Sequence, residues 1–134
     1  MNIGELPEHP LAGRRIWVVD RDPLLRDTVA ALIQRWGGSA RGFEDLPALL
    51  RESRGSELPE ALVLERTPQL ERFQGALRKF EREPLPTLVM GEGQTLPLSP
   101  ASLGLSRLGF VEKPFPGDEF IQALLALLRP QPQR

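Results

Sequence analysis

The sequence has no cysteine and only one histidine among its 134 residues. Without cysteine there is no disulfide bond, no thiol nucleophile and no zinc site built on thiolates, and this composition fits a reducing compartment. The single histidine, His9, lies beside prolines close to the N-terminus. We therefore do not expect His9 to act as a phosphodonor, a metal ligand or a catalytic base.

The sequence also lacks long apolar runs and blocks of like charge. A membrane-spanning helix needs about 20 consecutive apolar residues, and a secretory signal needs a basic segment followed by an apolar one; neither pattern occurs. The 17 basic and 18 acidic residues are interspersed and give a net charge of −1, whereas binding to nucleic acid or an anionic membrane needs clustered basic residues. We expect a cytoplasmic domain that contacts neither nucleic acid nor membrane.

Proline-containing segments without periodicity form both ends of the sequence. We expect residues 1–13 to be an N-terminal linker and residues 130–134 to be a C-terminal tail. The residues between them, 14–129, have room for one hydrophobic core, so we expect a single domain there. Ends of this kind are common in domains that belong to longer chains.

Short apolar runs alternate with helical periodicities between these ends, which predicts β/α units around a parallel sheet. The expected strands are residues 15–20, 39–43, 60–65, 87–90 and 109–112. The expected helices begin near residues 22, 45, 68, 99 and 116, and the last one ends near residue 129. The pattern predicts a doubly wound α/β fold with a five-stranded parallel sheet and flanking helices.

Five residues stand at the carboxyl ends of the expected strands: Asp20, Arg21, Glu65, Gly91 and Lys113. Right-handed crossovers bring the carboxyl ends of parallel strands to one edge of a sheet, and the functional crevice usually lies there. These five residues therefore form the candidate site.

Two segments of the sequence resemble a known family. Residues 11–20 resemble the start of a receiver domain attached to a hybrid histidine kinase, and residues 109–115 contain the Lys-Pro-Phe sequence typical of receivers after their fifth strand. Over residues 13–129 the chain is similar to receiver domains of response regulators and hybrid sensor kinases. The resemblance implies a flavodoxin-like receiver fold, a role in two-component (phosphorelay) signal transduction, and a sensor kinase domain or another two-component protein as partner, with homodimerisation as a further option.

The resemblance also assigns a role to each residue of the candidate site. Asp20 matches the first of two acids after the first strand, and Lys113 matches the lysine after the fifth. Arg21 replaces the second acid, which is a magnesium ligand in working receivers. Glu65 replaces the phospho-accepting aspartate, and Gly91 replaces a threonine or serine. This is the pattern of a degenerate receiver, or pseudo-receiver.

Each replacement works against phosphoryl transfer, which depends on positioning and on a metal ion that neutralises charge. Arg21 brings a permanent positive charge to the metal position. Glu65 is longer than aspartate by one methylene, and a misplacement of about 1 Å can cost on the order of 10²-fold in rate. Gly91 provides no hydroxyl. We expect no catalysis, no cofactor and no magnesium binding, and hence a phosphorylation-independent domain.

Opposite charges balance in the candidate site, since Asp20 and Glu65 are opposed by Arg21 and Lys113. We hypothesise that the two cations bracket Glu65 and fill the metal position, with the guanidinium making two parallel hydrogen bonds to the carboxylate. Glu65 is interpreted either as an inert acid at a strand end or as an imitation of a phosphorylated aspartate that locks the domain in one state.

Two other functions are compatible with parts of the sequence. Asp20-Arg21-Asp22 after an apolar strand resembles the opening motif of haloacid dehalogenase-type phosphatases, although Asp22-Pro23 is better explained as a helix cap. A receiver regulated by a non-phosphate ligand in the altered crevice is the other alternative.

Two apolar features near the C-terminus bear on partner binding. Phe110 matches the aromatic residue that rotates in receivers, although we expect packing in the core as its main role. The last expected helix has a wider apolar arc than one core contact needs. Either the helix is broadly buried, or its second stripe is a candidate interface, as the resemblance implies; this stripe consists of Ile121, Leu125 and Leu128.

Overall fold

The computed structural model describes residues 9–53, 55, 57–67, 85–92 and 107–129. Within these ranges the chain forms five strands and three helices. The strands are β1 (Arg15–Val19), β2 (Ser39–Phe43), β3 (Ala61–Glu65), β4 (Pro86–Glu92) and β5 (Arg107–Lys113). The helices are α1 (Pro23–Arg35), α2 (Leu46–Glu52) and α6 (Gly117–Leu128). The helices expected from residues 68 and 99 lie outside the described residues.

All strand pairs in the sheet are parallel, and the strand order is β2-β1-β3-β4-β5. The chain passes from β1 outward to β2, then crosses back to β3 on the other side of β1 and continues to β4 and β5. This reversal places a topological switch point between β1 and β3, where open α/β sheets form their crevice. The predicted doubly wound, five-stranded parallel sheet is confirmed.

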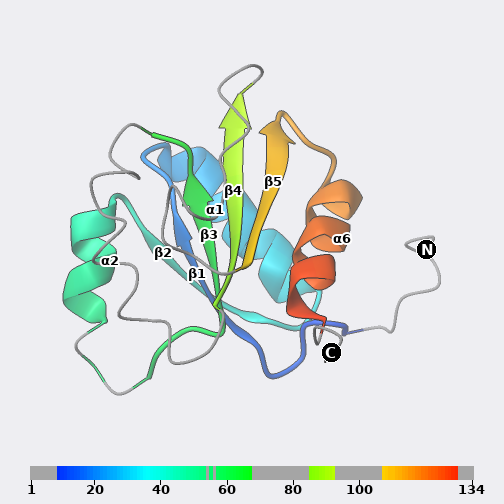
Figure 1. Ribbon diagram of the computed structural model, residues 1–134, viewed down its shortest axis with the longest axis horizontal. Helices are drawn as coiled ribbons and strands as arrows, with labels where there is room; N and C mark the ends of the chain where they lie inside the picture. Colours follow the sequence, from blue (N-terminus) through cyan, green and yellow to red (C-terminus); the bar gives the residue numbers. More distant parts are fainter. Residues whose placement is uncertain (1–8, 54, 56, 68–84, 93–106, 130–134) are drawn as a thin grey trace.

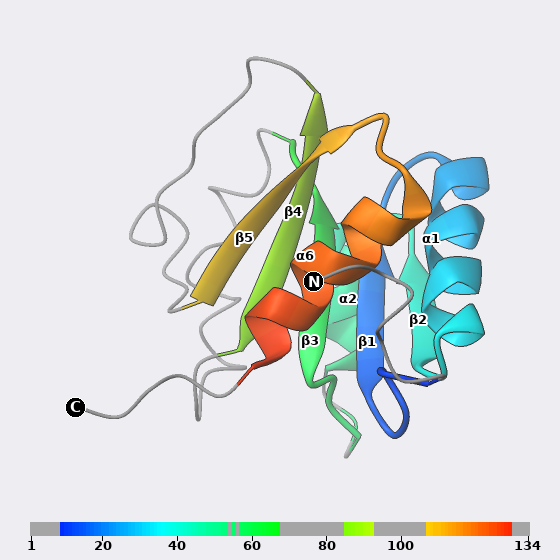
Figure 2. The same ribbon diagram turned by 90° about the vertical axis from the view of Figure 1, so that its right-hand side faces the viewer.

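Helices cover both faces of the sheet (Figures 1 and 2). One core cluster joins α2 to the face that carries Trp17, Leu64 and Val89. The other joins α1 and α6 to the opposite face, which carries Val18, Val63 and Met90, among others. Successive strand residues alternate between the two clusters, as expected for strands buried on both sides.

Side-chain caps fix where α1 and α2 begin. The Asp22 carboxylate accepts a hydrogen bond from the Leu24 N–H at 3.0 Å, and the Asp45 carboxylate accepts one from the Ala48 N–H at 2.9 Å. A proline also occupies the first turn of each helix, where its missing N–H costs nothing. After α1 the chain turns at Gly37, whose φ of +95° favours glycine.

The packed part of the chain starts earlier than expected. Leu11 is fully buried in the core cluster that contains α1 and α6, and its N–H donates to the carbonyl of Trp36 at 3.0 Å. The expected linker over residues 1–13 therefore includes at least one core residue, and the boundary at residue 13 is corrected. Across the residues that the structure describes, no helix combines the length and the apolar character needed to cross a membrane.

Candidate functional site

The structure brings four of the predicted site residues, Asp20, Arg21, Glu65 and Lys113, into one ion-pair cluster at the carboxyl edge of the sheet. The Lys113 ammonium lies 3.0 Å from Asp20 Oδ2 and 3.8 Å from Glu65 Oε2. Asp20 follows β1 and Glu65 ends β3, which are neighbouring strands, whereas Lys113 reaches across from β5. The lysine therefore joins the two acids on either side of the switch point.

Asp20 is completely buried, and several neighbouring residues form hydrogen bonds with its polar atoms. Its Oδ1 accepts a hydrogen bond from the Asp22 N–H at 2.8 Å, and its Oδ2 accepts one from Lys113 Nζ at 3.0 Å. Its backbone N–H donates to the carbonyl of Phe43, and its carbonyl accepts from Arg26 Nη1 at 3.0 Å. A buried charge is tolerated only when it is paired and hydrogen-bonded, and Asp20 meets both conditions.

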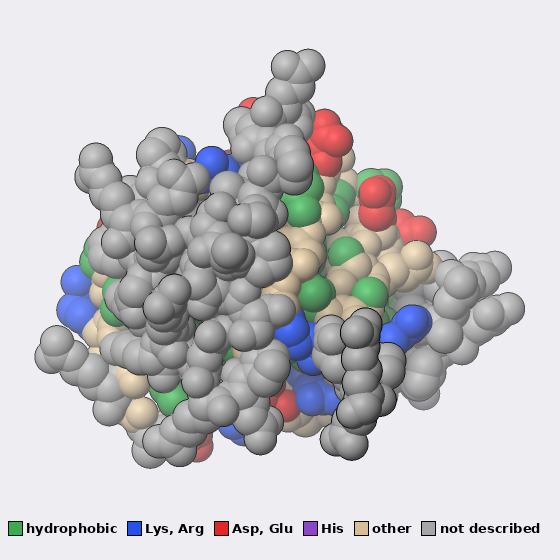
Figure 3. Space-filling view, viewed as in Figure 1, with side chains coloured by type: hydrophobic (Ala, Val, Ile, Leu, Met, Phe, Trp, Pro, Cys, Tyr) green, Lys and Arg blue, Asp and Glu red, His purple; other side chains and the backbone are tan. Residues whose placement is uncertain are grey.

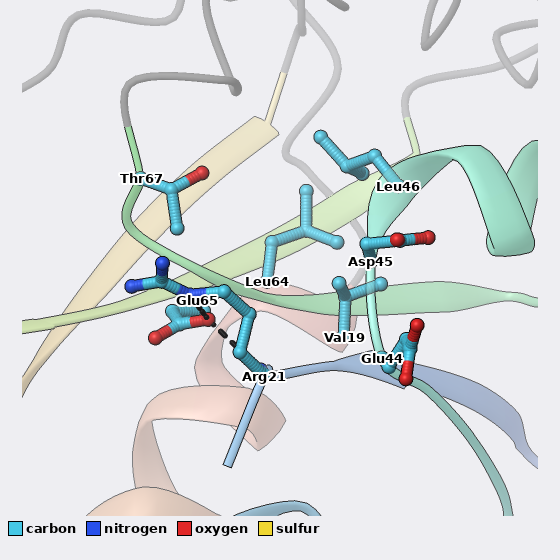
Figure 4. Close-up of a pocket in the computed structure, with 8 residues that line it drawn as sticks. All are labelled: Val19, Arg21, Glu44, Asp45, Leu46, Leu64, Glu65 and Thr67. Atoms are coloured by element: carbon cyan, nitrogen blue, oxygen red, sulfur yellow. Dashed lines mark hydrogen bonds and ion pairs between the residues drawn. The ribbon is translucent and has the colours of Figure 1, made fainter.

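Arg21 and Glu65 form the outer half of the cluster (Figure 4). Glu65 Oε1 accepts a hydrogen bond from the Arg21 backbone N–H at 3.0 Å, and Arg21 Nε lies 3.4 Å from the same oxygen. The Arg21 side chain is 74% exposed, whereas that of Glu65 is only 14% exposed. The expected pair of parallel guanidinium hydrogen bonds is therefore wrong: the arginine stem runs past the carboxylate, and the backbone amide is the closer donor.

The receiver resemblance implies a magnesium ion, and the donor set of this cluster does not fit one. Magnesium needs free oxygen ligands in near-ideal octahedral geometry. Here each oxygen of Asp20 and Glu65 lies within 4 Å of an amide, guanidinium or ammonium nitrogen. Among the described residues, no three His, Cys, Asp or Glu side chains come together as a metal site. A pocket beside Arg21 and Glu65 measures about 10 Å³, which is the space of a single water molecule.

The sequence and the fold are similar to those of known response regulators. The chain is 28% identical over 115 residues to the transcriptional regulatory protein FixJ of Bradyrhizobium diazoefficiens, covering 85% of this chain and 56% of FixJ. The crystal structure of full-length FixJ from B. japonicum matches with a TM-score of 0.70 at 26% identity, over 87% of this chain and 58% of FixJ. The fold is that of a response-regulator receiver domain.

More distant structures share the receiver fold. The chemotaxis response regulator CheY4 of Vibrio cholerae matches with a TM-score of 0.70 at 18% identity, over 85% of this chain and 98% of CheY4. NtrX from Brucella abortus matches with a TM-score of 0.74 at 22% identity, over 86% of this chain and 26% of NtrX. No protein-family model matches the sequence. The chain spans just over half the length of FixJ, to which it is homologous.

The two remaining receiver positions, Gly91 and Phe110, lie next to each other on β4 and β5. Gly91 is buried, and its α-carbon faces the edge of the Phe110 ring. Phe110 is 40% exposed, so the expected packing of this ring in the core is wrong. The ring leans diagonally across the strand pair, because Phe110 is in register with Val89, two residues before Gly91.

The candidate interface on α6 is only partly available. Ile121 is fully buried and belongs to the core cluster with α1, so its expected place on a docking surface is wrong. Leu125 and Leu128 are partly exposed and pack against the margin of that cluster. The physical reason is that α6 contacts β4, β5 and α1 at once, which buries a wider arc than one contact would.

An open groove that sequence reasoning missed runs between α1 and the segment from β5 to α6. It has a volume of about 760 Å³, and its lining includes Leu24, Leu25, Leu32, Pro114 and Phe115. Leu24 is 75% exposed. From the sequence, these residues are predicted to form the apolar face of a helix and a neighbouring turn. The sequence does not show whether that face is buried in the core or lines an open groove.

Acidic side chains surround one end of this groove. Asp22 and Glu92 line it directly, and Asp118 and Glu119 are exposed in the first turn of α6. Figure 3 shows acidic side chains gathered at the upper right, beside apolar ones, over the carboxyl ends of the strands and the start of α6. Lys113 also lines the groove, but its charge is directed to Asp20 and Glu65.

Proposed function

We propose that this chain is a pseudo-receiver: a phosphorylation-independent protein-interaction module of two-component signalling. The observation that supports the proposal most strongly is that the Asp20 and Glu65 carboxylates are already paired with nitrogen donors. All four oxygens of Asp20 and Glu65 already face nitrogen donors from Arg21, Asp22 and Lys113. The nucleophile and the metal ligands of a receiver would have to come from these same oxygens.

The charge balance supports the same function. Phosphoryl transfer needs a cation that bridges carboxylate and phosphoryl oxygens. In this chain Arg21 and Lys113 already neutralise Asp20 and Glu65, so a divalent ion would bring a net charge of +2 into a neutral site. We propose that the domain binds no magnesium and has no enzymatic activity, in either the receiver or the phosphatase interpretation. In the latter, the second acid, Asp22, serves as the cap of α1.

The groove beside α1 supports an interaction role. Its apolar lining with acidic side chains at one end is complementary to a partner helix that presents apolar residues flanked by lysine or arginine. We propose that such a helix, from a sensor kinase or another two-component protein, docks there. Because the chain spans just over half of FixJ, we further propose that it is part of a longer cytoplasmic signalling protein.

Amide chemical shifts provide the test of phosphorylation independence. We expect magnesium with beryllium fluoride, or with a small phosphodonor such as acetyl phosphate, to leave the amides of Glu65, Gly91 and Lys113 unmoved, and we expect no phosphoryl adduct by mass spectrometry. Saturable shifts at these amides would contradict the proposal. Magnesium alone is the control that separates ion binding from phosphoryl binding.

Peptide binding provides the test of the groove. We expect a synthetic helical peptide with leucines on one face and flanking lysines to bind, and we expect its glutamate counterpart to bind far more weakly. Leu24→Ser should weaken binding of the lysine peptide, because Leu24 lines the groove and is 75% exposed. Equal binding of the two peptides would contradict the proposed charge complementarity.

A further inference from the structure

Lys113 lies between two groups of acidic side chains that compete for its charge. On one side are Asp20 and Glu65 of the ion-pair cluster, whose oxygens lie 3.0 Å and 3.8 Å from Lys113 Nζ. On the other side are Asp22 and Glu92, which line the groove beside α1 together with Lys113. Glu92 on β4 is in register with Lys113 on β5, and opposite charges on neighbouring strands attract each other.

Burial decides this competition in favour of the cluster. The Asp20 side chain is fully buried and that of Lys113 is 15% exposed, whereas Glu92 is exposed to solvent. Water and salt screen a buried charge pair much less than an exposed one. A buried carboxylate that lost its cation would also be costly. Lys113 therefore stays with Asp20 and does not neutralise the acidic end of the groove.

We propose that Asp20 and Glu65 hold the Lys113 ammonium out of the groove, and that this gives the groove its preference for a basic partner helix. This role rests on the proposed function, because it concerns the same groove. Neither acid is among the described residues that line the groove, so both act through Lys113 as positioning residues. Without them, the ammonium would turn towards Glu92 and repel lysine or arginine side chains of the docking helix.

Peptide binding to designed variants tests this role. The probes are the leucine and lysine peptide and its glutamate counterpart, and the preference is the ratio of their dissociation constants. We expect Asp20→Asn combined with Glu65→Gln to lower the preference for the lysine peptide by about tenfold, because the released Lys113 repels it. Addition of Lys113→Met to this double variant should recover most of the preference. Asp20→Asn alone should have a smaller effect, because Glu65 still lies 3.8 Å from Lys113 Nζ.

Glu52→Gln combined with Glu60→Gln is the matched control. It also removes two acids that are paired with arginine, so the change in net charge is the same. Glu52 ends α2, which packs on the face of the sheet opposite α1, and Glu60 precedes β3 at the amino edge. Salt screens exposed charges beyond about 10 Å at 0.1 M. The control should therefore keep the preference of the wild type.

The reactivity of the Lys113 amine gives a readout that needs no peptide. The sequence contains two lysines, Lys79 and Lys113, so reductive methylation followed by mass spectrometry can report on Lys113 relative to Lys79. We expect Lys113 to react severalfold faster in Asp20→Asn with Glu65→Gln than in the wild type. An unchanged rate, or an equal change of preference in the control, would overturn this role even if the lysine peptide binds. Failure of the wild type to bind the lysine peptide would refute the docking function itself, and this role with it.

Discussion

Replacement of Lys113 by methionine is the sharpest test of the ion-pair cluster. Methionine keeps most of the length and apolar volume of lysine but removes the charge. In the wild type, Lys113 Nζ lies 3.0 Å from Asp20 Oδ2, where the Asp20 side chain is fully buried and that of Lys113 is 15% exposed. The variant leaves Asp20 as a buried carboxylate whose hydrogen bond from the Asp22 N–H remains.

The expected loss of unfolding free energy depends on how deeply the ion pair is buried and not on the distance between its charged atoms. Removal of one partner of a buried ion pair costs about 3–5 kcal/mol of unfolding free energy. We expect the lower end of this range, because the Asp22 amide still stabilises the carboxylate and the Lys113 side chain is partly exposed. The Arg41–Glu52 pair is shorter, at 2.8 Å, but its side chains are 54% and 45% exposed. Its removal should cost only about 0–1 kcal/mol.

Urea unfolding at neutral pH measures both effects, with Arg41→Met as the control. The double variant Asp20→Asn with Lys113→Met should recover most of the loss, because replacing both partners removes the uncompensated charge. If Lys113→Met loses less than about 1 kcal/mol, or if the two methionine variants lose equal amounts, burial of the pair does not govern its contribution. The reasoning about this site would then be refuted.

Three further substitutions test the local structure. Asp22→Ala should lose about 1 kcal/mol in urea unfolding because it removes the cap of α1, with Asp22→Asn as the conservative control. Ile121→Ala should lose about 2–5 kcal/mol, and Leu128→Ala clearly less, since Ile121 is fully buried and Leu128 is not; equal losses would contradict the correction to the candidate interface. Gly37→Ala should lower the thermal midpoint, because φ is +95° and its β-carbon would lie 2.7 Å from His9 Cβ; an unchanged midpoint would contradict this local geometry.

The sheet and the convergence of its carboxyl ends could be predicted from the sequence, because both follow from short apolar runs and from the rules for parallel crossovers. The starts of α1 and α2 were also predictable, since an Asp followed closely by Pro has a strong local preference for a helix start. Leu11 was not predictable in the same way. Proline-rich composition indicates a linker, but one apolar side chain within it can still dock on the core.

The sequence predicted which residues meet at the carboxyl edge of the sheet, but not the geometry of their contacts. Strand ends identify Asp20, Glu65 and Lys113, but the path of the Arg21 side chain depends on the backbone of the loop after β1. That loop presents its N–H to Glu65 and directs the guanidinium outward. The contact of Phe110 with Gly91 was likewise hidden, because it is a diagonal contact between strands and depends on the register of β4 and β5.

The two receiver residues that this chain retains are physically dependent on each other. Asp20 is completely buried, and Lys113 is the cation closest to it. Loss of Lys113 would leave the buried Asp20 carboxylate without its cation, at a cost that does not depend on phosphorylation, whereas loss of Asp20 would leave Lys113 with Glu65 at 3.8 Å. The pairing of Asp20 with Lys113 therefore affects folding without any phosphoryl transfer, and the presence of the two residues is weak support for phosphoryl transfer. Among the three altered positions, Arg21 and Glu65 contact each other, since the Arg21 N–H donates to Glu65 Oε1, whereas Gly91 lies against the Phe110 ring. Under the proposed function, restoring phosphoryl transfer should require changes at Arg21, Glu65 and Gly91 together.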